Sequence, residues 1–396
     1  MIAPEPFFEP RGTPFSEFHR IRALTALGHQ VDLVTYPFGQ SVSMPGLRVF
    51  RSLRPPFVRH VKIGPSLAKI PLDALLGLSA LRRAISGRYD VIHSHEEGGL
   101  IGALLAMALR VPHLYDMHSS LPQQLSNFAF SRSRVIKGVF LAIERFMIRR
   151  SRVVIVICPS LEETVKAIEP GAQTVLIENA PGSAEDEATP EAAAAVRRSL
   201  NLGTAPIVLY TGTFEAYQGL DLLFAAMAIV RRSRPDARLV LAGGRADQVA
   251  KAREQARAAG IEEVTRLAGE RPASEIPAYL LASDLLVSPR SRGTNTPLKI
   301  YQYLRSGKAI VATRLLTHTQ VLSDETAILT GVTPQEYADG ILAGLTDTAR
   351  ATAIGGRARE LAETKYSYDA YLEKTRQACA ALIPAPPAGA VVKDVA

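Results

Sequence analysis

The sequence of 396 residues has no tryptophan, two cysteines and few aromatic residues, which make up 6% of the chain. Cys158 and Cys379 cannot build a disulfide framework and have no metal-ligand spacing around them, so they favour a reducing, cytoplasmic compartment. Few aromatic side chains are available to stack on bases, and no nucleic-acid-binding motif is visible. Nucleic acid is therefore not expected as a partner.

Long apolar runs are missing as well. No stretch reaches the roughly 18 apolar residues that a membrane span needs, and acidic residues and prolines interrupt the first 40 residues, unlike a secretory signal. Hydrophobic residues make up 47% of the chain and charged residues 21%, which excludes a mostly disordered protein. By its length, the chain is expected to form two or three domains.

Short apolar runs alternate with longer helical patterns along most of the chain, which predicts doubly wound α/β domains. Uninterrupted apolar runs are typical of parallel strands that are buried on both faces. Such runs occupy residues 31–35, 91–93, 153–158, 207–210, 239–242, 285–287 and 309–312. Helices are expected between them at residues 15–27, 67–85, 135–150, 220–232, 247–259 and 334–345.

A polar, acidic and proline-containing stretch at residues 182–190 is typical of a linker. We therefore predict an N-terminal domain over residues 1–180 and a C-terminal domain over residues 181–382, whose last helix is a candidate to cross back. Residues 383–396, rich in proline and alanine, are expected to form a flexible tail. Ile2 and Ala3 resemble the end of a strand that lacks its beginning, so a start upstream of Met1 stays open.

Polar residues follow the predicted strands of the N-terminal domain. Gly12 lies in a turn before a helix, where a backbone can approach an anionic ligand. His93 and His95 alternate along a strand and point to one face, as a metal pair would, with Glu97 as a third ligand. We favour instead the lining of a cleft at the carboxyl edge of the sheet.

Asp116 and His118 follow another strand. They are candidates for acid–base chemistry or for contacts to sugar hydroxyls, with a purely structural histidine as the alternative. The neighbouring polar residues Ser119 and Ser120 suggest a lining for a hydroxylated acceptor.

Two segments of the C-terminal domain suit a phosphate group. In the first, a strand runs into the loop of Gly212 and then into a helix, although the loop matches neither a P-loop nor a dinucleotide-binding motif. In the second, Arg290, Arg292 and Lys299 gather around a helix that Pro297 is expected to start. Such a cluster suits a diphosphate; an ordinary βαβ unit with surface charges is the alternative.

In this order and spacing the segments resemble the retaining nucleotide-sugar glycosyltransferases of family 4, which have the GT-B fold. The resemblance spans residues 4–381 and includes Asp-Val-Ile-His-Ser-His, Asp-Met-His-Ser, Gln-Gly-Leu-Asp and Tyr-Leu-Arg-Ser-Gly-Lys. It implies two Rossmann-like domains facing across a cleft. The first would bind the acceptor and the second a nucleoside diphosphate sugar, without a metal or other cofactor. By this likeness Gly12 and Gly212 lie near the donor phosphates, and His118 contacts the donor sugar.

The sequence also departs from the family pattern, because neutral residues occupy four usually charged positions. Thr294 and Gln302 stand where the family has two glutamates, and Thr213 and Gln218 where it has an arginine and a lysine. Gln302 can still hydrogen bond a ribose hydroxyl. We favour an active enzyme in which nearby basic residues supply the missing charge. A non-catalytic sugar-nucleotide-binding or scaffold protein is the alternative, and an epimerase, which needs a carboxylate cluster, is least favoured.

Most of the net charge of +8 comes from residues 1–180, and two stretches there combine basic and apolar residues. Residues 48–69 and 128–152 are candidates for contact with an anionic membrane surface, with merely solvated arginines as the alternative. Such contact would place the protein at the inner face of the membrane and favour a lipid or lipid-linked acceptor.

The sequence thus predicts a hexosyltransferase that acts on a glycan, lipid or lipid-linked hydroxyl, the base, sugar and acceptor being undetermined. Retention of configuration is implied by the family resemblance alone. Its predicted catalytic residues are His118, Arg292 and Lys299. The predicted donor-binding residues are Gly12, Gly212, Thr213, Gln218, Arg290, Thr294, Asn295, Thr296 and Gln302. The predicted acceptor-binding residues are His95, Glu96, Asp116, Ser119 and Ser120.

Overall fold

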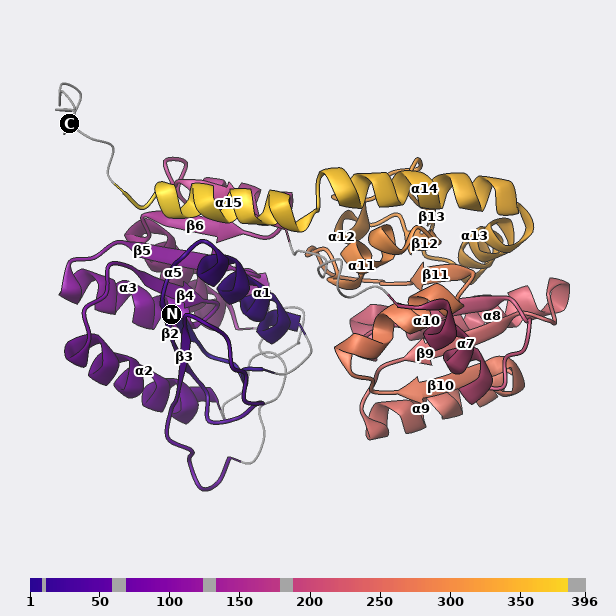
Figure 1. The fold of residues 1–396 in the computed structure, drawn as a ribbon, viewed down its shortest axis with the longest axis horizontal. Helices are drawn as coiled ribbons and strands as arrows, with labels where there is room; N and C mark the ends of the chain where they lie inside the picture. Colours follow the sequence, from indigo (N-terminus) through magenta and orange to yellow (C-terminus); the bar gives the residue numbers. More distant parts are fainter. Residues whose placement is uncertain (9–11, 59–68, 124–132, 179–187, 384–396) are drawn as a thin grey trace. The chain divides into compact units, whose positions relative to one another are not determined.

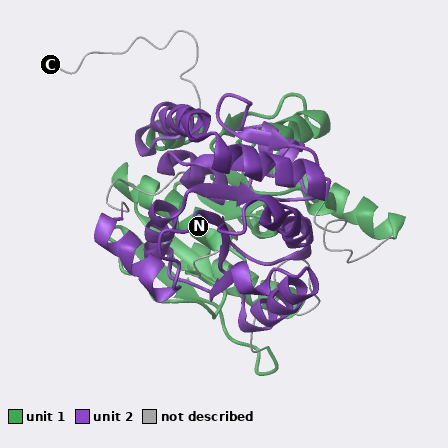
Figure 2. Ribbon diagram, turned by 90° about the vertical axis from the view of Figure 1, so that its right-hand side faces the viewer, with its two compact units in different colours: residues 1–178, 371–396 green, residues 179–370 purple. Residues whose placement is uncertain are grey.

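The computed structural model describes residues 1–8, 12–58, 69–123, 133–178 and 188–383, and its chain forms two compact units (Figure 1; Figure 2). Unit 1 comprises residues 1–178 and 371–396, and unit 2 comprises residues 179–370. The division along the chain falls between Glu178 and Asn179, and the chain re-enters unit 1 at Tyr371.

The described part of unit 1 contains a seven-stranded parallel sheet in the order β3-β2-β1-β4-β5-β6-β7. Its strands are β1 (Ile2–Ala3), β2 (Val31–Thr35), β3 (Leu47–Arg51), β4 (Ile92–His95), β5 (His113–Met117), β6 (Val153–Val156) and β7 (Thr174–Leu176). The helices are α1 (Gly12–Ala26), α2 (Lys69–Ser86), α3 (Gly98–Leu109), α5 (Arg134–Arg150), α6 (Pro159–Ile168) and the greater part of α15 (Tyr368–Ala380).

Unit 2 contains a six-stranded parallel sheet in the order β10-β9-β8-β11-β12-β13. Its strands are β8 (Ile207–Thr211), β9 (Arg238–Ala242), β10 (Thr265–Gly269), β11 (Leu285–Ser288), β12 (Ala309–Thr313) and β13 (Ile328–Thr330). The helices of four or more residues are α7 (Pro190–Ser199), α8 (Leu220–Ser233), α9 (Ala246–Ala258), α10 (Ile276–Ala282), α11 (Lys299–Ser306), α12 (Leu316–Thr319), α13 (Pro334–Thr346) and α14 (Thr348–Thr364).

Helices cover both faces of the unit 2 sheet, because its strands are apolar on both sides. Val208 and Tyr210 belong to a core cluster with α8 and α13, while Ile207 and Leu209 belong to a second cluster with α11 and α14. Alternate residues of a strand point to opposite faces, so this division is what a fully buried strand requires. The prediction of doubly wound α/β domains is confirmed.

The predicted helix at residues 334–345 is confirmed, with the Thr333 side chain capping its N-terminus and Pro334 in its first turn. The predicted start of a helix at Pro297 is wrong, since α11 begins at Lys299. Pro297 lies just outside: its carbonyl accepts a hydrogen bond from the Ile300 N–H at 3.0 Å, which gives a tight turn before the regular helix.

Among the described helices, none combines the length and the hydrophobicity that crossing a bilayer requires. Cys158 and Cys379 are both free thiols.

Candidate active site

The glycine loop of unit 2 brings the end of β8 against the start of α11. Gly212 has φ of +124°, a backbone conformation that favours glycine. A Cβ atom built on Gly212 would lie 3.4 Å from Nζ of Lys299. Two residues predicted from distant motifs are therefore neighbours at the carboxyl edge of the parallel sheet, where ligands of such sheets bind.

Lys299 is the first residue of α11 and is only 7% exposed. Its Nζ lies 3.6 Å from the centre of the Tyr210 ring and has no hydrogen-bond partner among the described residues. Burial, and secondarily the charge of Arg290, lower the pKa of Lys299 well below its usual value. A buried amine without a counter-charge is unfavourable, so an anion bound beside Gly212 would be strongly stabilised.

Further unpaired polar atoms occur on the two segments that carry Gly212 and Lys299. The Thr296 hydroxyl, one turn before Lys299, and the Gln218 side-chain oxygen are buried without partners among the described residues. On the glycine loop, Gln218 Nε2 lies 3.5 Å from the Thr213 hydroxyl. Gln302 is one turn after Lys299 on α11 and is half-buried. These neutral groups can bind a sugar or a ribose, although they cannot replace a carboxylate.

Arg290 holds the loop between β11 and α11 in place. Its Nε donates to the Arg292 carbonyl at 3.0 Å and its Nη1 to the Asn295 carbonyl at 2.8 Å, while its guanidinium lies 5.0 Å from the centre of the Tyr217 ring. The Thr294 hydroxyl is 3.4 Å from the Asn295 side-chain oxygen. Arg290 is thus bound to its own loop as well as adding positive charge near Lys299.

Arg292 differs from the other two basic residues. Its side chain is exposed, and no ion pair or side-chain hydrogen bond is found for it among the described residues. The structure gives it no contact with Lys299, so its catalytic assignment stays a prediction.

Sequence reasoning missed His318, a buried residue of α12. The Ser288 hydroxyl lies 2.8 Å from its Nε2, and its Nδ1 lies 2.8 Å from the Thr313 carbonyl. Burial lowers the pKa of His318 to about 3. A neutral imidazole therefore ties together the ends of β11 and β12, and the Thr313 hydroxyl in turn donates to the Arg290 carbonyl at 2.6 Å. No motif in the sequence marks this support.

Unit 1 contains a buried ion pair at the carboxyl end of β5. Arg20 Nε donates to Asp116 Oδ2 at 2.9 Å, and Arg20 Nη1 donates to the Thr375 hydroxyl of α15 at 3.1 Å. Burial alone would raise the pKa of Asp116, but Arg20 and then His118 lower it well below its usual value. The carboxylate is thus held ionised, and α15 helps to hold its arginine.

His118, predicted from the sequence as a site residue, lies beside this carboxylate. Its Nε2 lies 3.1 Å from Asp116 Oδ1, and both side chains are buried. Burial opposes the charged imidazole, yet Asp116 raises the pKa of His118 above its usual value. His118 can therefore hold a proton and donate it to a hydroxyl or an anion.

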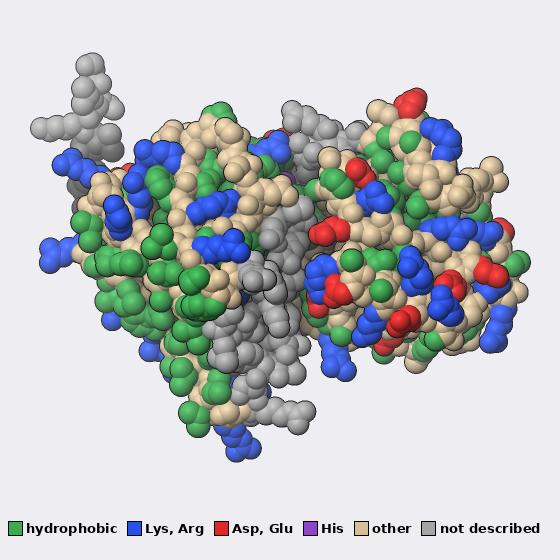
Figure 3. Space-filling model, turned by 90° about the horizontal axis from the view of Figure 1, so that it is seen from below, with side chains coloured by type: hydrophobic (Ala, Val, Ile, Leu, Met, Phe, Trp, Pro, Cys, Tyr) green, Lys and Arg blue, Asp and Glu red, His purple; other side chains and the backbone are tan. Residues whose placement is uncertain are grey.

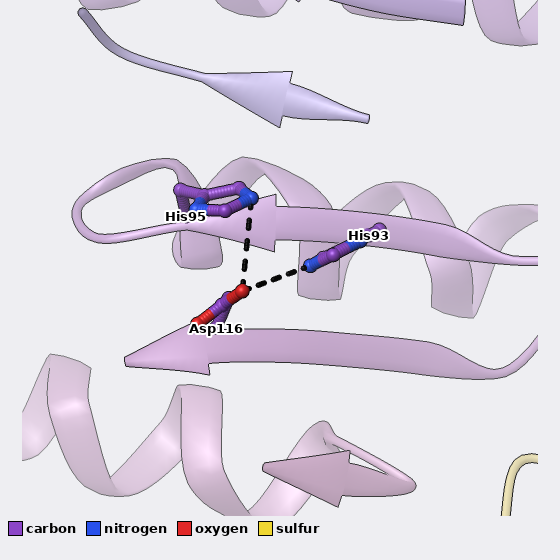
Figure 4. A group of neighbouring side chains, drawn as sticks. All are labelled: His93, His95 and Asp116. Atoms are coloured by element: carbon purple, nitrogen blue, oxygen red, sulfur yellow. Dashed lines mark ion pairs between the residues drawn. The ribbon is translucent and has the colours of Figure 1, made fainter. Parts of the chain in front are cut away.

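His93 and His95 both turn toward Asp116 from the neighbouring strand β4 (Figure 4). Their Nε2 atoms lie 3.6 and 3.9 Å from Asp116 Oδ2, which is too long for hydrogen bonds. All three residues offer ligand atoms within 4.8 Å of one another. Asp116, rather than the Glu97 suggested by the spacing, is the third member, because Glu97 pairs with Lys69 at 2.5 Å.

This donor set is one that Zn²⁺ accepts in proteins. However, the Arg20 guanidinium already occupies the Asp116 oxygen nearest to both imidazoles. A divalent ion would sit against a buried cation. Burial also lowers the pKa of His93 and His95, so both are neutral around the ionised carboxylate.

The predicted acceptor residues Glu96 and Ser119 are in contact. The Ser119 hydroxyl lies 3.1 and 3.0 Å from the two Glu96 carboxyl oxygens. Glu96 has φ of +45°, unusual for a residue other than glycine, and burial raises its pKa to about 8. Ser120 instead donates to the buried Glu144 at 3.1 Å, so it supports the fold of this loop.

Two further buried carboxyl groups were missed in the sequence. Glu5 follows β1 and Glu17 lies on α1, and both have raised pKa values because they are buried. Their mutual repulsion contributes to the shift of Glu5. Gly12 is the first residue of α1, while residues 9–11 of its predicted loop lie outside the described part of the chain.

Comparison with known proteins finds a matching family model in each half of the chain. Residues 19–180 match the model described as "Glycosyl transferase 4-like domain", and residues 193–361 match "Glycosyl transferases group 1". The chain belongs to glycosyltransferase family 4. Its relatives are glycosyltransferases, which supports a transferase enzyme.

One family 4 relative is the D-inositol 3-phosphate glycosyltransferase of Thermobispora bispora, 27% identical over 68% of this chain and 66% of the relative. Among solved structures, sucrose-phosphate synthase from Thermosynechococcus elongatus has a TM-score of 0.78 at 21% identity, covering 96% of this chain and 98% of that one. Anabaena HepE, solved with UDP and glucose, has a TM-score of 0.74 at 19% identity, with 96% and 98% covered. These likenesses show the GT-B fold.

Proposed function

We propose that this family 4 protein transfers a hexosyl group from a nucleoside diphosphate sugar to a hydroxyl acceptor with retention of configuration. The observation that carries the proposal is the buried, unpaired amine of Lys299 beside Gly212. A donor diphosphate supplies the negatively charged partner that the Lys299 amine lacks, and a cation at this place stabilises the leaving group.

In the proposed reaction, a bond forms between the acceptor oxygen and the anomeric carbon of the donor. The bond between that carbon and the diphosphate oxygen breaks, and its electron pair leaves with the diphosphate. The hydroxyl proton passes to the departing phosphate oxygen or to solvent. Lys299 offsets the charge that develops on the diphosphate, which is why the proposed reaction needs no metal ion.

The remaining assignments follow the chemistry of each side chain. Gln302 and Thr294 bind donor hydroxyls, and Arg292, which is exposed, reaches the diphosphate from the loop that Arg290 holds. In unit 1, His118 donates to a sugar hydroxyl while Asp116 stabilises its charge. Glu96 and Ser119 are assigned to the acceptor.

A thermal-shift panel tests donor binding directly. UDP, GDP, ADP and TDP and their hexose derivatives are added to the protein with and without magnesium. A ligand at about 100 times its dissociation constant adds roughly 2.7 kcal/mol to stability. We expect a clear rise with one base and no dependence on magnesium. No rise with any nucleotide would contradict the proposal.

One observation favours a second candidate function, binding without turnover. Thr294 and Gln302 replace the two glutamates typical of the family, so no carboxylate is present at these positions. A release assay separates the two functions. It measures nucleoside diphosphate released from the donor that stabilises the protein in the thermal-shift panel, with inositol phosphate, glycans and lipid hydroxyls as acceptors. An enzyme releases it only with an acceptor, whereas a binding protein is stabilised by the donor yet releases none.

A further inference from the structure

Helix α2 has apolar residues on its solvent side as well as on its buried side. Leu72, Leu76, Ala80 and Ala84 are buried against the sheet. On the other side, Ile70, Leu78, Leu81 and Ile85 are exposed by 64, 58, 42 and 73%. Their spacing of three, four and eight residues places them on one face of the helix. A helix at a protein surface normally has polar residues there.

Helix α3 continues this apolar surface. It has no charged residue, and Leu104 and Met107, one turn apart, are exposed by 53 and 46%. The two helices are in contact, since a Cβ atom built on Gly77 of α2 would lie 3.6 Å from the Ile101 side chain of α3. We call the exposed set the α2–α3 face; it consists of Ile70, Leu78, Leu81, Ile85, Leu104 and Met107.

The charges around the α2–α3 face are mostly positive. Arg82 borders the exposed stripe of α2, Arg88 follows α2, and Arg110 caps α3; all three are exposed and have no ion pair among the described residues. Within residues 69–90 and 98–112 the acidic residues are Asp73, which accepts a hydrogen bond from the Tyr36 hydroxyl, and the exposed Asp90. Figure 3 shows hydrophobic side chains gathered on unit 1, with Lys and Arg side chains at their border.

We propose that the α2–α3 face docks on an anionic lipid bilayer surface. Leucine, isoleucine and methionine side chains insert at the boundary between headgroups and acyl chains, while the arginines pair with lipid phosphates. A second copy of the chain fits less well, since a two-fold interface would bring one surface rich in arginine against another.

The proposal does not rest on the proposed transferase function, although it specifies where a lipid-linked acceptor would be met. The two amphipathic stretches indicated by the sequence, residues 48–69 and 128–152, include parts outside the described residues. In the second stretch, the first half of α5 exposes Val135 and Val139 beside Arg134 and Lys137. Helix α3 packs against α5 as well as against α2.

Vesicle co-sedimentation of the full chain tests the proposal. We compare phosphatidylcholine vesicles with vesicles that contain about 30% phosphatidylglycerol, an amount chosen to give a strong surface charge. Wild-type protein is expected to bind the anionic vesicles at least tenfold more tightly, and less in high salt. The double variant Leu78→Gln/Ile85→Gln is expected to lose this binding at least tenfold. The matched control Leu281→Gln/Leu316→Gln changes two leucines of unit 2 that are exposed by 41 and 51%, and it should bind as wild type does.

Unchanged vesicle binding by Leu78→Gln/Ile85→Gln would overturn the proposal. The proposal would also be overturned if the wild type sediments as a dimer and this variant as a monomer, because the face would then bind a second copy of the chain. Stabilisation by a nucleotide, measured on the same variant, keeps the two proposals apart: loss of vesicle binding with nucleotide binding intact supports the docking face alone.

Discussion

The amine of Lys299 lies 3.6 Å from the centre of the Tyr210 ring and forms no hydrogen bond to any described residue. A cation over an aromatic ring gains a favourable contact, but the ring does not neutralise it. The arrangement keeps an amine at the carboxyl edge of the unit 2 sheet whose protonated form is disfavoured by burial and would be stabilised by a bound anion.

Replacing Lys299 by methionine is therefore expected to stabilise the ligand-free protein by about 1–3 kcal/mol, the usual cost of a buried unsatisfied polar group. The pKa of Lys299 is lowered in the folded state, so wild-type stability falls as the pH drops below about 10.5, where the unfolded chain binds the proton first. The advantage of Lys299→Met should grow between pH 10 and pH 7. Denaturant unfolding at several pH values measures it, and a variant less stable than wild type at pH 7 would count against an unpaired amine.

Arg290→Ala is expected to loosen the loop between β11 and α11. The substitution removes hydrogen bonds to the carbonyls of Arg292 and Asn295. This loss is expected to lower the free energy of unfolding by about 1–3 kcal/mol. Limited proteolysis should show faster cleavage within residues 291–296. Arg305→Ala, in α11, serves as the control. Equal cleavage of the two variants would show that Arg290 does not hold the loop.

Glu96→Gln is expected to change how stability depends on pH. The pKa of Glu96 rises from its usual 4.5 to about 8 on burial. Between these values the unfolded chain has released the proton that the folded chain keeps, so wild-type stability falls as pH rises. Glutamine cannot ionise, so the variant should gain relative to wild type from pH 5 to pH 8. Parallel pH profiles of the thermal midpoint would contradict this assignment.

The cluster of His93, His95 and Asp116 is expected to bind Zn²⁺ only weakly, because Arg20 already pairs with the Asp116 carboxylate. Treatment with EDTA should leave the thermal midpoint unchanged, and a tenfold excess of Zn²⁺ should not raise it. A rise with Zn²⁺ that disappears in His95→Gln would establish a metal site instead.

The sequence predicted the alternation of strands and helices well, since a parallel strand such as β12 is a continuous apolar run. The predicted limits of a strand were wrong where pairing with a neighbouring strand sets its first and last residues. The strand predicted at residues 91–93 starts at Ile92 and continues to His95, because pairing with β5 extends through Asp116. Strand β3 is half-exposed and lacks an apolar run, so it gave no signal.

The site was predictable only in part. Gly212 and Lys299 were named from motifs 87 residues apart, yet their contact depends on the order of β8 and β11 in the sheet. His318, Arg20 and Glu17 could not be identified, because their roles depend on partners far along the chain. The apolar solvent side of α2 was likewise hidden, since a sequence pattern cannot tell which of two apolar stripes packs on the sheet.

The most direct test of the account is the affinity of the preferred nucleoside diphosphate, measured by titration calorimetry for wild type and for Lys299→Met. The exposed Lys251→Met in unit 2 is the matched control. The account predicts that Lys299→Met weakens binding by about 2 kcal/mol, roughly thirtyfold, that Arg292→Ala weakens it less, and that Lys251→Met has no effect. Equal affinity of Lys299→Met and wild type would contradict the central claim that this buried amine binds the donor diphosphate.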